Sequence, residues 1–95
     1  MNATNTVAVQ HDADSRRFAT SVDGHTGYVE YEPSADGIVI THTIVPSAIG
    51  GRGIAGQLVA AVVAHAHQAG WTVASCCSYA DAWLDRHPEH ADLRR

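Results

Sequence analysis

The residues best suited to chemistry are a glycine-rich segment, Gly50 to Gly56, and three reactive side chains, His42, Cys77 and Tyr79. Within the segment, G-R-G-I-A-G matches the pattern G-x-G-x-x-G and precedes a stretch of helical periodicity. A glycine-rich turn that opens a helix presents unpaired backbone N–H groups at the positive end of the helix dipole, and such turns bind phosphate or pyrophosphate. The alternative is a tight strand-to-helix turn that needs small residues and binds nothing.

The surroundings of this turn narrow the choice of phosphate ligand. A P-loop is excluded because no Gly-Lys-Ser/Thr follows the glycines. A dinucleotide fold would place the turn after its first strand and an acidic residue at the end of the next one. Here the next predicted strand runs into Ser75-Cys76-Cys77, and no carboxylate lies between the start of that strand and Asp81. The pyrophosphate carrier that remains is coenzyme A.

Each of the three reactive side chains has a structural interpretation beside the functional one; for Tyr79 it is an aromatic ring that packs on the sheet with its hydroxyl hydrogen-bonded. Cys77 lies at a predicted strand-to-helix junction, where a helix N-terminus lowers the pKa of a thiol; alternatively it is a small buried hydrophobic residue. His42 alternates with Ile38, Ile40 and Ile44, which predicts that it lies on their face of the strand. It is there either a hydrogen-bonded core residue or a group that contacts the acyl or amine site.

The elements that must position these residues change period at mid-chain. Short alternating stretches predict strands over 6–10, 17–22, 26–31 and 38–45. Apolar residues at helical spacing predict a helix over 54–69, followed by a strand over 71–74 and a helix over 78–87. The order β-β-β-β-α-β-α predicts a mixed α/β fold, in which an antiparallel meander is followed by one parallel, right-handed βαβ unit.

Composition excludes several classes of protein. The chain has 95 residues, which predicts a single domain over 1–95. Its net charge is −4 and no basic stripe is present, which argues against nucleic-acid binding. The longest apolar run, 58–64, is far shorter than the roughly 20 residues of a membrane span. With no signal-peptide pattern and two adjacent cysteines, we expect a cytoplasmic protein with reduced thiols.

Metal binding is not expected, although the chain has seven histidines. His65 and His67 are two positions apart on the predicted helix, so they point to different faces. His87 and His90 are separated by Pro88, and no further ligands cluster near them.

Several segments together resemble a known family: T-H-T-I-V-P over 41–46, G-R-G-I-A over 51–55, C-S-Y over 77–79 and R-H-P-E-H-A-D-L over 86–93. This combination is similar to the GNAT acyl-CoA-dependent N-acetyltransferases, and within them to the small YjdJ-type proteins. The resemblance covers most of the chain and implies a minimal GNAT fold. Gly50 stands where these enzymes usually carry Gln or Arg, so the backbone cradle is kept without that side chain.

The resemblance also implies a reaction and its residues. The protein would bind acetyl-CoA and transfer the acetyl group to an amine, with no metal and no further cofactor. The backbone of Ile44 and Val45 would pair with the pantetheine arm. Tyr79 would be the general acid, with Cys77 and His42 as further candidate catalytic residues. The pyrophosphate would be held by the turn: Gly50, Gly51, Arg52, Gly53, Ile54, Ala55 and Gly56.

Two alternatives stay open. The chain is a coenzyme A-binding or protein-interaction module without catalysis, or a small structural domain whose glycine turn is only a turn. The amine acceptor is not indicated, no membrane or nucleic-acid partner is expected, and a monomer or weak homodimer is expected.

Overall fold

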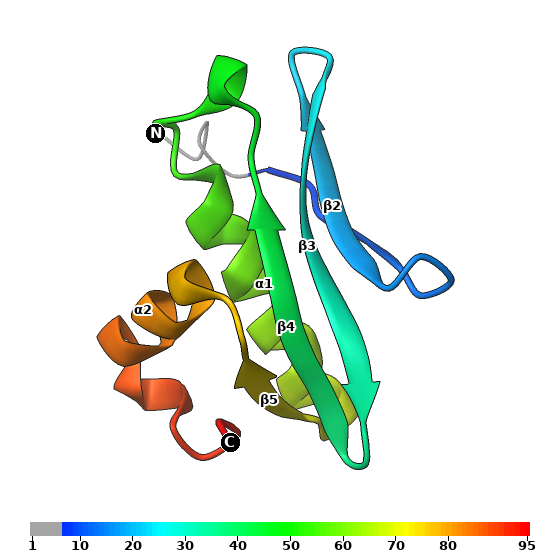
Figure 1. Ribbon diagram of the computed structural model, residues 1–95, viewed down its shortest axis with the longest axis vertical. Helices are drawn as coiled ribbons and strands as arrows, with labels where there is room; N and C mark the ends of the chain where they lie inside the picture. The colour runs from blue at the N-terminus through cyan, green and yellow to red at the C-terminus, as the bar shows by residue number, and fades with distance from the viewer. Residues whose placement is uncertain (1–6) are drawn as a thin grey trace.

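A five-stranded mixed sheet with two α-helices makes up the fold of residues 7–95, the part of the chain that the computed structural model describes. The strands lie side by side in chain order (Figure 1). The elements, in order, are β1 (Gln10–Asp12), β2 (Arg17–Val22), β3 (His25–Ser34), β4 (Gly37–Ile44), η2 (Ser47–Ile49), α1 (Ile54–Ala69), β5 (Thr72–Ser75), α2 (Ser78–Arg86) and η3 (Pro88–His90).

The first four strands form the predicted antiparallel meander. Its tightest connection is the β2–β3 hairpin, in which Val22 pairs with His25 and only Asp23 and Gly24 form the loop. Both loop residues have positive φ, 50° and 78°, as a two-residue hairpin loop of this twist requires. The Asp-Gly pair therefore sets the register of β2 against β3.

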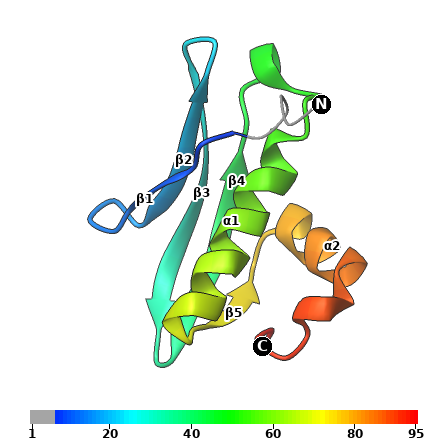
Figure 2. The same cartoon turned by 180° about the vertical axis from the view of Figure 1, so that it is seen from behind.

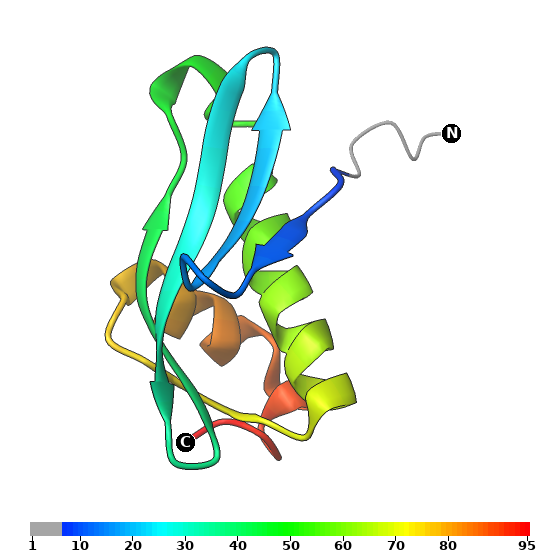
Figure 3. The ribbon, with the colours of Figure 1, turned by 90° about the vertical axis from the view of Figure 1, so that its right-hand side faces the viewer.

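The second half is the predicted βαβ unit. β4 pairs in parallel with β5, and α1 connects them across one face of the sheet (Figures 2 and 3). Gly53 and Gly70 cap the two ends of α1, both in the left-handed conformation. The fold class, the element order and the mixed sheet are thus confirmed.

The core lies between α1 and the inner face of the sheet. Apolar side chains of α1 at helical spacing face alternate residues of the strands, as predicted from the two periods. The largest of these buried side chains are Val29, Ile38, Ile40, Ile49, Leu58, Val59, Val62, Val63 and Val73.

The prediction for the first strand is wrong in its bounds. The strand was placed at 6–10, but β1 covers Gln10–Asp12, and Thr6 lies outside the described residues. The alternating Val7 and Val9 pack against the core without pairing in the sheet. Side chains hold this segment instead, because Gln57 Oε1 accepts a hydrogen bond from the Val7 amide at 2.7 Å.

The prediction that His42 shares a face with Ile38 and Ile40 is also wrong. Tyr31 pairs with Ile40, and Glu30 pairs with His42, so Thr41 is an extra residue that forms a β-bulge in β4. The bulge reverses the alternation: Ile38 and Ile40 are buried, whereas His42 is exposed on the opposite face. The structure therefore contradicts the interpretation of His42 as a core residue.

Candidate active site

The two parallel strands separate at the middle of β4. Their pairing ends where Ile40 meets Ser75, and a last hydrogen bond joins the Cys76 amide to the Ile40 carbonyl at 2.8 Å. β4 continues to Ile44, while the chain after β5 turns away into α2 (Figure 1). The 41–44 segment thus has no β5 partner along this edge, and an extended ligand can pair with its backbone.

The glycine-rich turn lies at the far end of this segment. Gly51 and Gly53 have φ of 77° and 76°, and a Cβ on either would contact nothing within 4 Å. The first turn of α1 carries no acidic side chain. Among residues 7–95, no acidic side chain of the helix itself therefore opposes an anion at the unpaired N–H groups and the positive end of the helix dipole.

Arg52, the one arginine in the turn, is already paired. Its NH1 lies 2.7 Å from Asp23 Oδ2 at the tip of the β2–β3 hairpin. About half of the Arg52 side chain and two thirds of the Asp23 side chain are exposed, at 48% and 68%. Such an exposed pair is weak, so the guanidinium can exchange Asp23 for a bound phosphate at little cost.

Gly56 has a different environment from the other glycines of the turn. It lies inside α1, where a Cβ would be 3.4 Å from the Tyr79 hydroxyl oxygen and 3.7 Å from Trp83 Nε1. Its small size lets α2 approach the beginning of α1. The Tyr79 hydroxyl consequently lies beside the first turn of α1.

Cys77 is held at the N-terminus of α2 by several hydrogen-bond donors. Its Sγ lies 3.5 Å from Thr43 Oγ1 on the open segment of β4. Burial acts to raise the pKa of the thiol, but hydrogen bonds from the Thr43 hydroxyl and from the amides of Ala80, Tyr79 and Thr43 outweigh it. The pKa of Cys77 is consequently lowered. A thiolate in this position faces the point where β4 and β5 diverge.

Cys76 differs from its neighbour. It is exposed, whereas Cys77 is half-buried, and both cysteines are free. The Ser75 side chain fixes the backbone between them, because its Oγ accepts from the Cys77 amide and donates to the Cys77 carbonyl, each at 3.0 Å.

His42 lies on the outer face of the sheet, beside a carboxylate. Its Nδ1 is 3.3 Å from Glu30 Oε1, and the other oxygen of Glu30 accepts from Arg17 NH2 at 3.2 Å. Arg17 in turn lies over the ring of Tyr28, 4.1 Å from its centroid. Glu30 thus orients the imidazole from one side, and no hydrogen bond among the described residues joins His42 to Cys77.

Sequence reasoning missed three parts of this arrangement: Thr43 as the partner of Cys77, Glu30 as the partner of His42, and Asp23 as the partner of Arg52. Each partner comes from a strand or hairpin far away along the chain. Only Thr43 carried a signal, since it belongs to the T-H-T segment.

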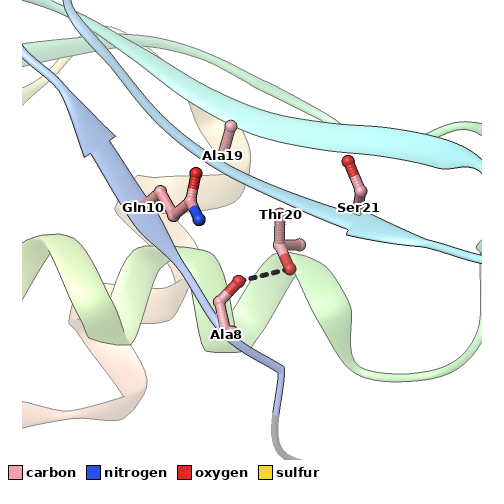
Figure 4. Close-up of a pocket in the computed structure, with 5 residues that line it drawn as sticks. All are labelled: Ala8, Gln10, Ala19, Thr20 and Ser21. Carbon is pink, nitrogen blue, oxygen red and sulfur yellow. Dashed lines mark hydrogen bonds between the residues drawn. The ribbon is translucent and has the colours of Figure 1, made fainter.

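A hollow of about 230 Å³ lies apart from these groups, between β2 and the segment that leads into β1 (Figure 4). It is lined by Ala8, Gln10, Ala19, Thr20 and Ser21, none of which is titratable. The Thr20 hydroxyl there donates to the Ala8 carbonyl at 2.6 Å. This hollow has no group that would do acyl transfer.

Neither of the two α-helices in residues 7–95 is long and apolar enough to cross a membrane. Within the same residues, no three His, Cys, Asp or Glu side chains are grouped so as to hold a metal ion.

Comparison with known proteins gives the family of this mixed sheet, whose parallel strands diverge beside a glycine turn and a helix N-terminus. The family model for GCN5-related N-acetyl-transferases matches residues 17–93. The chain belongs to this family. Its fold is similar to the solution NMR structure of a GCN5-like protein from Staphylococcus aureus. The TM-score is 0.73 at 23% identity, over 95% of this chain and 89% of the other.

Proposed function

We propose that the protein transfers an acetyl group from acetyl-CoA to an amine. The observation that carries this proposal is the edge of β4 beyond its pairing with β5, which has the glycine turn at one end and Cys77 beside Thr43. A helix N-terminus and an unpaired strand edge are what the pyrophosphate and the pantetheine arm of acetyl-CoA would need. Membership of the family supports the same reaction.

The binding roles follow from this arrangement. The amides from Gly50 to Gly56 would hold the pyrophosphate, with Arg52 adding a charge after it leaves Asp23. The backbone of Ile44 and Val45 would pair with the amides of the pantetheine arm, because β4 continues beyond its pairing with β5. An amide of β4 would then donate a hydrogen bond to the thioester carbonyl and stabilise the oxyanion.

The chemistry divides between the two faces of the sheet. The amine nitrogen attacks the acetyl carbon, the bond from that carbon to sulfur breaks, and the coenzyme A thiolate leaves. Tyr79, beside the first turn of α1, would protonate the departing thiolate. His42, oriented by Glu30 on the other face, would take the proton of an amine that arrives from that side. Cys77, whose pKa is lowered, would be the second group to accept this proton.

Two measurements on the whole chain test the proposal. Thermal unfolding is first followed with acetyl-CoA, coenzyme A and NAD; we expect stabilisation by the first two only. Thiol release from acetyl-CoA is then measured with a panel of amines, against His42→Gln and Tyr79→Phe. Binding without thiol release would favour the coenzyme A-binding module, and stabilisation by none of the three ligands would contradict the proposal.

A further inference from the structure

A cavity of about 440 Å³ lies at the opposite end of the sheet from the glycine turn. Its lining includes residues of the β3–β4 hairpin, which lies at the lower end of the sheet in Figure 1, and Trp71, which follows the end of α1. Its walls are mostly apolar and include the rings of His11, Tyr31 and Trp71. Ring centroids of Tyr31 and Trp71 are 6.4 Å apart, and those of His11 and Trp71 are 6.1 Å apart. Three rings thus face one space.

The polar groups of this cavity favour a positively charged ligand. Asp36 supplies the one carboxylate among its lining residues, and burial and the nearby His65 lower the pKa of His11. The ring of His11 is further engaged by the Tyr31 hydroxyl, 2.6 Å from its Nε2. The cavity therefore combines aromatic faces with one carboxylate, inside a chain of net charge −4.

One polar atom beside the cavity has no partner. The Ser34 hydroxyl oxygen is shielded from solvent and makes no hydrogen bond to any described residue. Ser34 is one of the residues that line the cavity. A buried hydroxyl without a partner is costly, and a ligand that accepts or donates a hydrogen bond would relieve that cost.

From these observations we propose that the cavity is a binding site for a small organic cation, an alkylated or aryl-substituted ammonium, separate from the acetyl site. The ammonium would lie against the faces of Trp71 and Tyr31, where the negative ring faces attract a cation, and near the Asp36 carboxylate. Asp36 Oδ1 is now paired with Arg95 NH1 at 2.6 Å, with both side chains mostly exposed. The ligand would replace the arginine in this pair.

The site is independent of the proposed acetyl transfer. The cavity shares no residue with the glycine turn, with Cys77 or with His42. β4 connects the two, with Gly37 and Ile38 at the cavity and Thr43 at Cys77. A cation bound at one end would thus leave the other end free for acetyl-CoA.

Tetramethylammonium chloride and a neutral molecule of similar size, tert-butanol, test the proposal by NMR at constant ionic strength. Since only tert-butanol can form a hydrogen bond with Ser34, tighter binding of the cation would be due to its charge. We expect saturable shifts of the Trp71 indole N–H and of the amides of 34–37 with the cation, while the Trp83 indole N–H stays unchanged. Binding of tert-butanol should be weaker by about threefold or more, because it lacks the cation–π attraction. Equal affinity for the two probes, or no saturable shift with the cation, would overturn the proposal.

Three variants separate the charge of Asp36 from the charge of the whole chain. Asp36→Asn keeps an acceptor for Thr72 Oγ1, now 3.0 Å away, and should weaken tetramethylammonium by about threefold. Arg95→Gln removes the guanidinium that competes for Asp36 and should strengthen the binding of tetramethylammonium. Asp23→Asn changes the net charge equally at the far end of the sheet and should have no effect. If Asp36→Asn and Asp23→Asn behaved alike, the carboxylate would not belong to the site.

Discussion

At the scale of single residues, the site depends on donors that converge on one sulfur atom. Cys77 receives hydrogen bonds from a β4 hydroxyl and from amides at the start of α2, so two elements must be in place for its pKa to fall. The rate at which the Cys77 thiol reacts should therefore depend on the positions of both β4 and α2. Neither element alone supplies the full set of donors.

Alkylation of Cys77 by iodoacetamide should therefore reach its half-maximal rate at a lower pH than that of an ordinary cysteine. The measurement uses Cys76→Ser, which removes the exposed neighbouring thiol. Thr43→Val, which removes the hydroxyl 3.5 Å from Sγ, should move the profile to higher pH. A profile that Thr43→Val leaves unchanged would contradict the role of this hydroxyl. Thr43→Ser, which keeps the hydroxyl, is the matched control.

The ion pair between Arg52 and Asp23 yields a second prediction at this scale. Asp23→Asn frees the guanidinium, so the affinity for coenzyme A should rise by about threefold at low salt, as measured by calorimetry. In an Arg52→Gln background, Asp23→Asn should leave the affinity for coenzyme A unchanged, because there is no guanidinium to release from the ion pair. An equal gain in both backgrounds would mean that Asp23 acts only through net charge.

At the scale of elements, most of the fold could be predicted from the sequence because its signals are local. The helical period of 54–69, the Gly70 stop and the Asp23-Gly24 loop each act within a few residues, and α1 has the predicted bounds. The bulge at Thr41 has no such signal. It arises from the pairing of β3 with β4, so the face of His42 could not be predicted from alternation.

The two ends of α1 allow a matched test of the glycine turn. Gly53 and Gly70 have nearly the same φ, 76° and 74°, and a Cβ at either position meets nothing within 4 Å. Gly53→Ala and Gly70→Ala should each lower the free energy of unfolding by about 1 kcal/mol, because alanine is strained at positive φ.

Only the substitution at the N-terminal end of the helix should change ligand binding. Gly53→Ala puts a methyl group in the space that the amides face, and should weaken coenzyme A by about tenfold. Gly70→Ala should leave the affinity as it is. Equal affinities in the two variants would show that the turn does not hold the pyrophosphate.

At the scale of the whole molecule, a cluster of rings ties the first strand to the helix layer. His11 of β1 stacks on Phe18, with ring centroids 4.1 Å apart, and meets the edge of His65 of α1 at 4.7 Å. Burial, and after it the electrostatic effect of the nearby His65, lowers the pKa of His11 below its ordinary value of 6.5. Protonation of this ring therefore opposes folding.

The stability of the protein should depend on pH in a defined window. In the unfolded chain His11 takes up a proton near pH 6.5, but in the folded protein only at lower pH. The free energy of unfolding, measured with urea, should thus be at its full value above pH 6.5. It should fall as the pH decreases through the folded pKa of His11. His11→Phe keeps a ring without a charge and should flatten this part of the curve; an unchanged curve would contradict the assignment.

The extra residue in β4 changes which side chains face each side of the sheet. Because of the bulge, His42 points outward to Glu30 and Thr43 points inward to Cys77. If Thr41 took an ordinary place in the alternation, with no bulge, His42 would face inward and Thr43 outward, so neither partner would be reached. A single irregularity in the pairing of β3 with β4 thus orients both side chains.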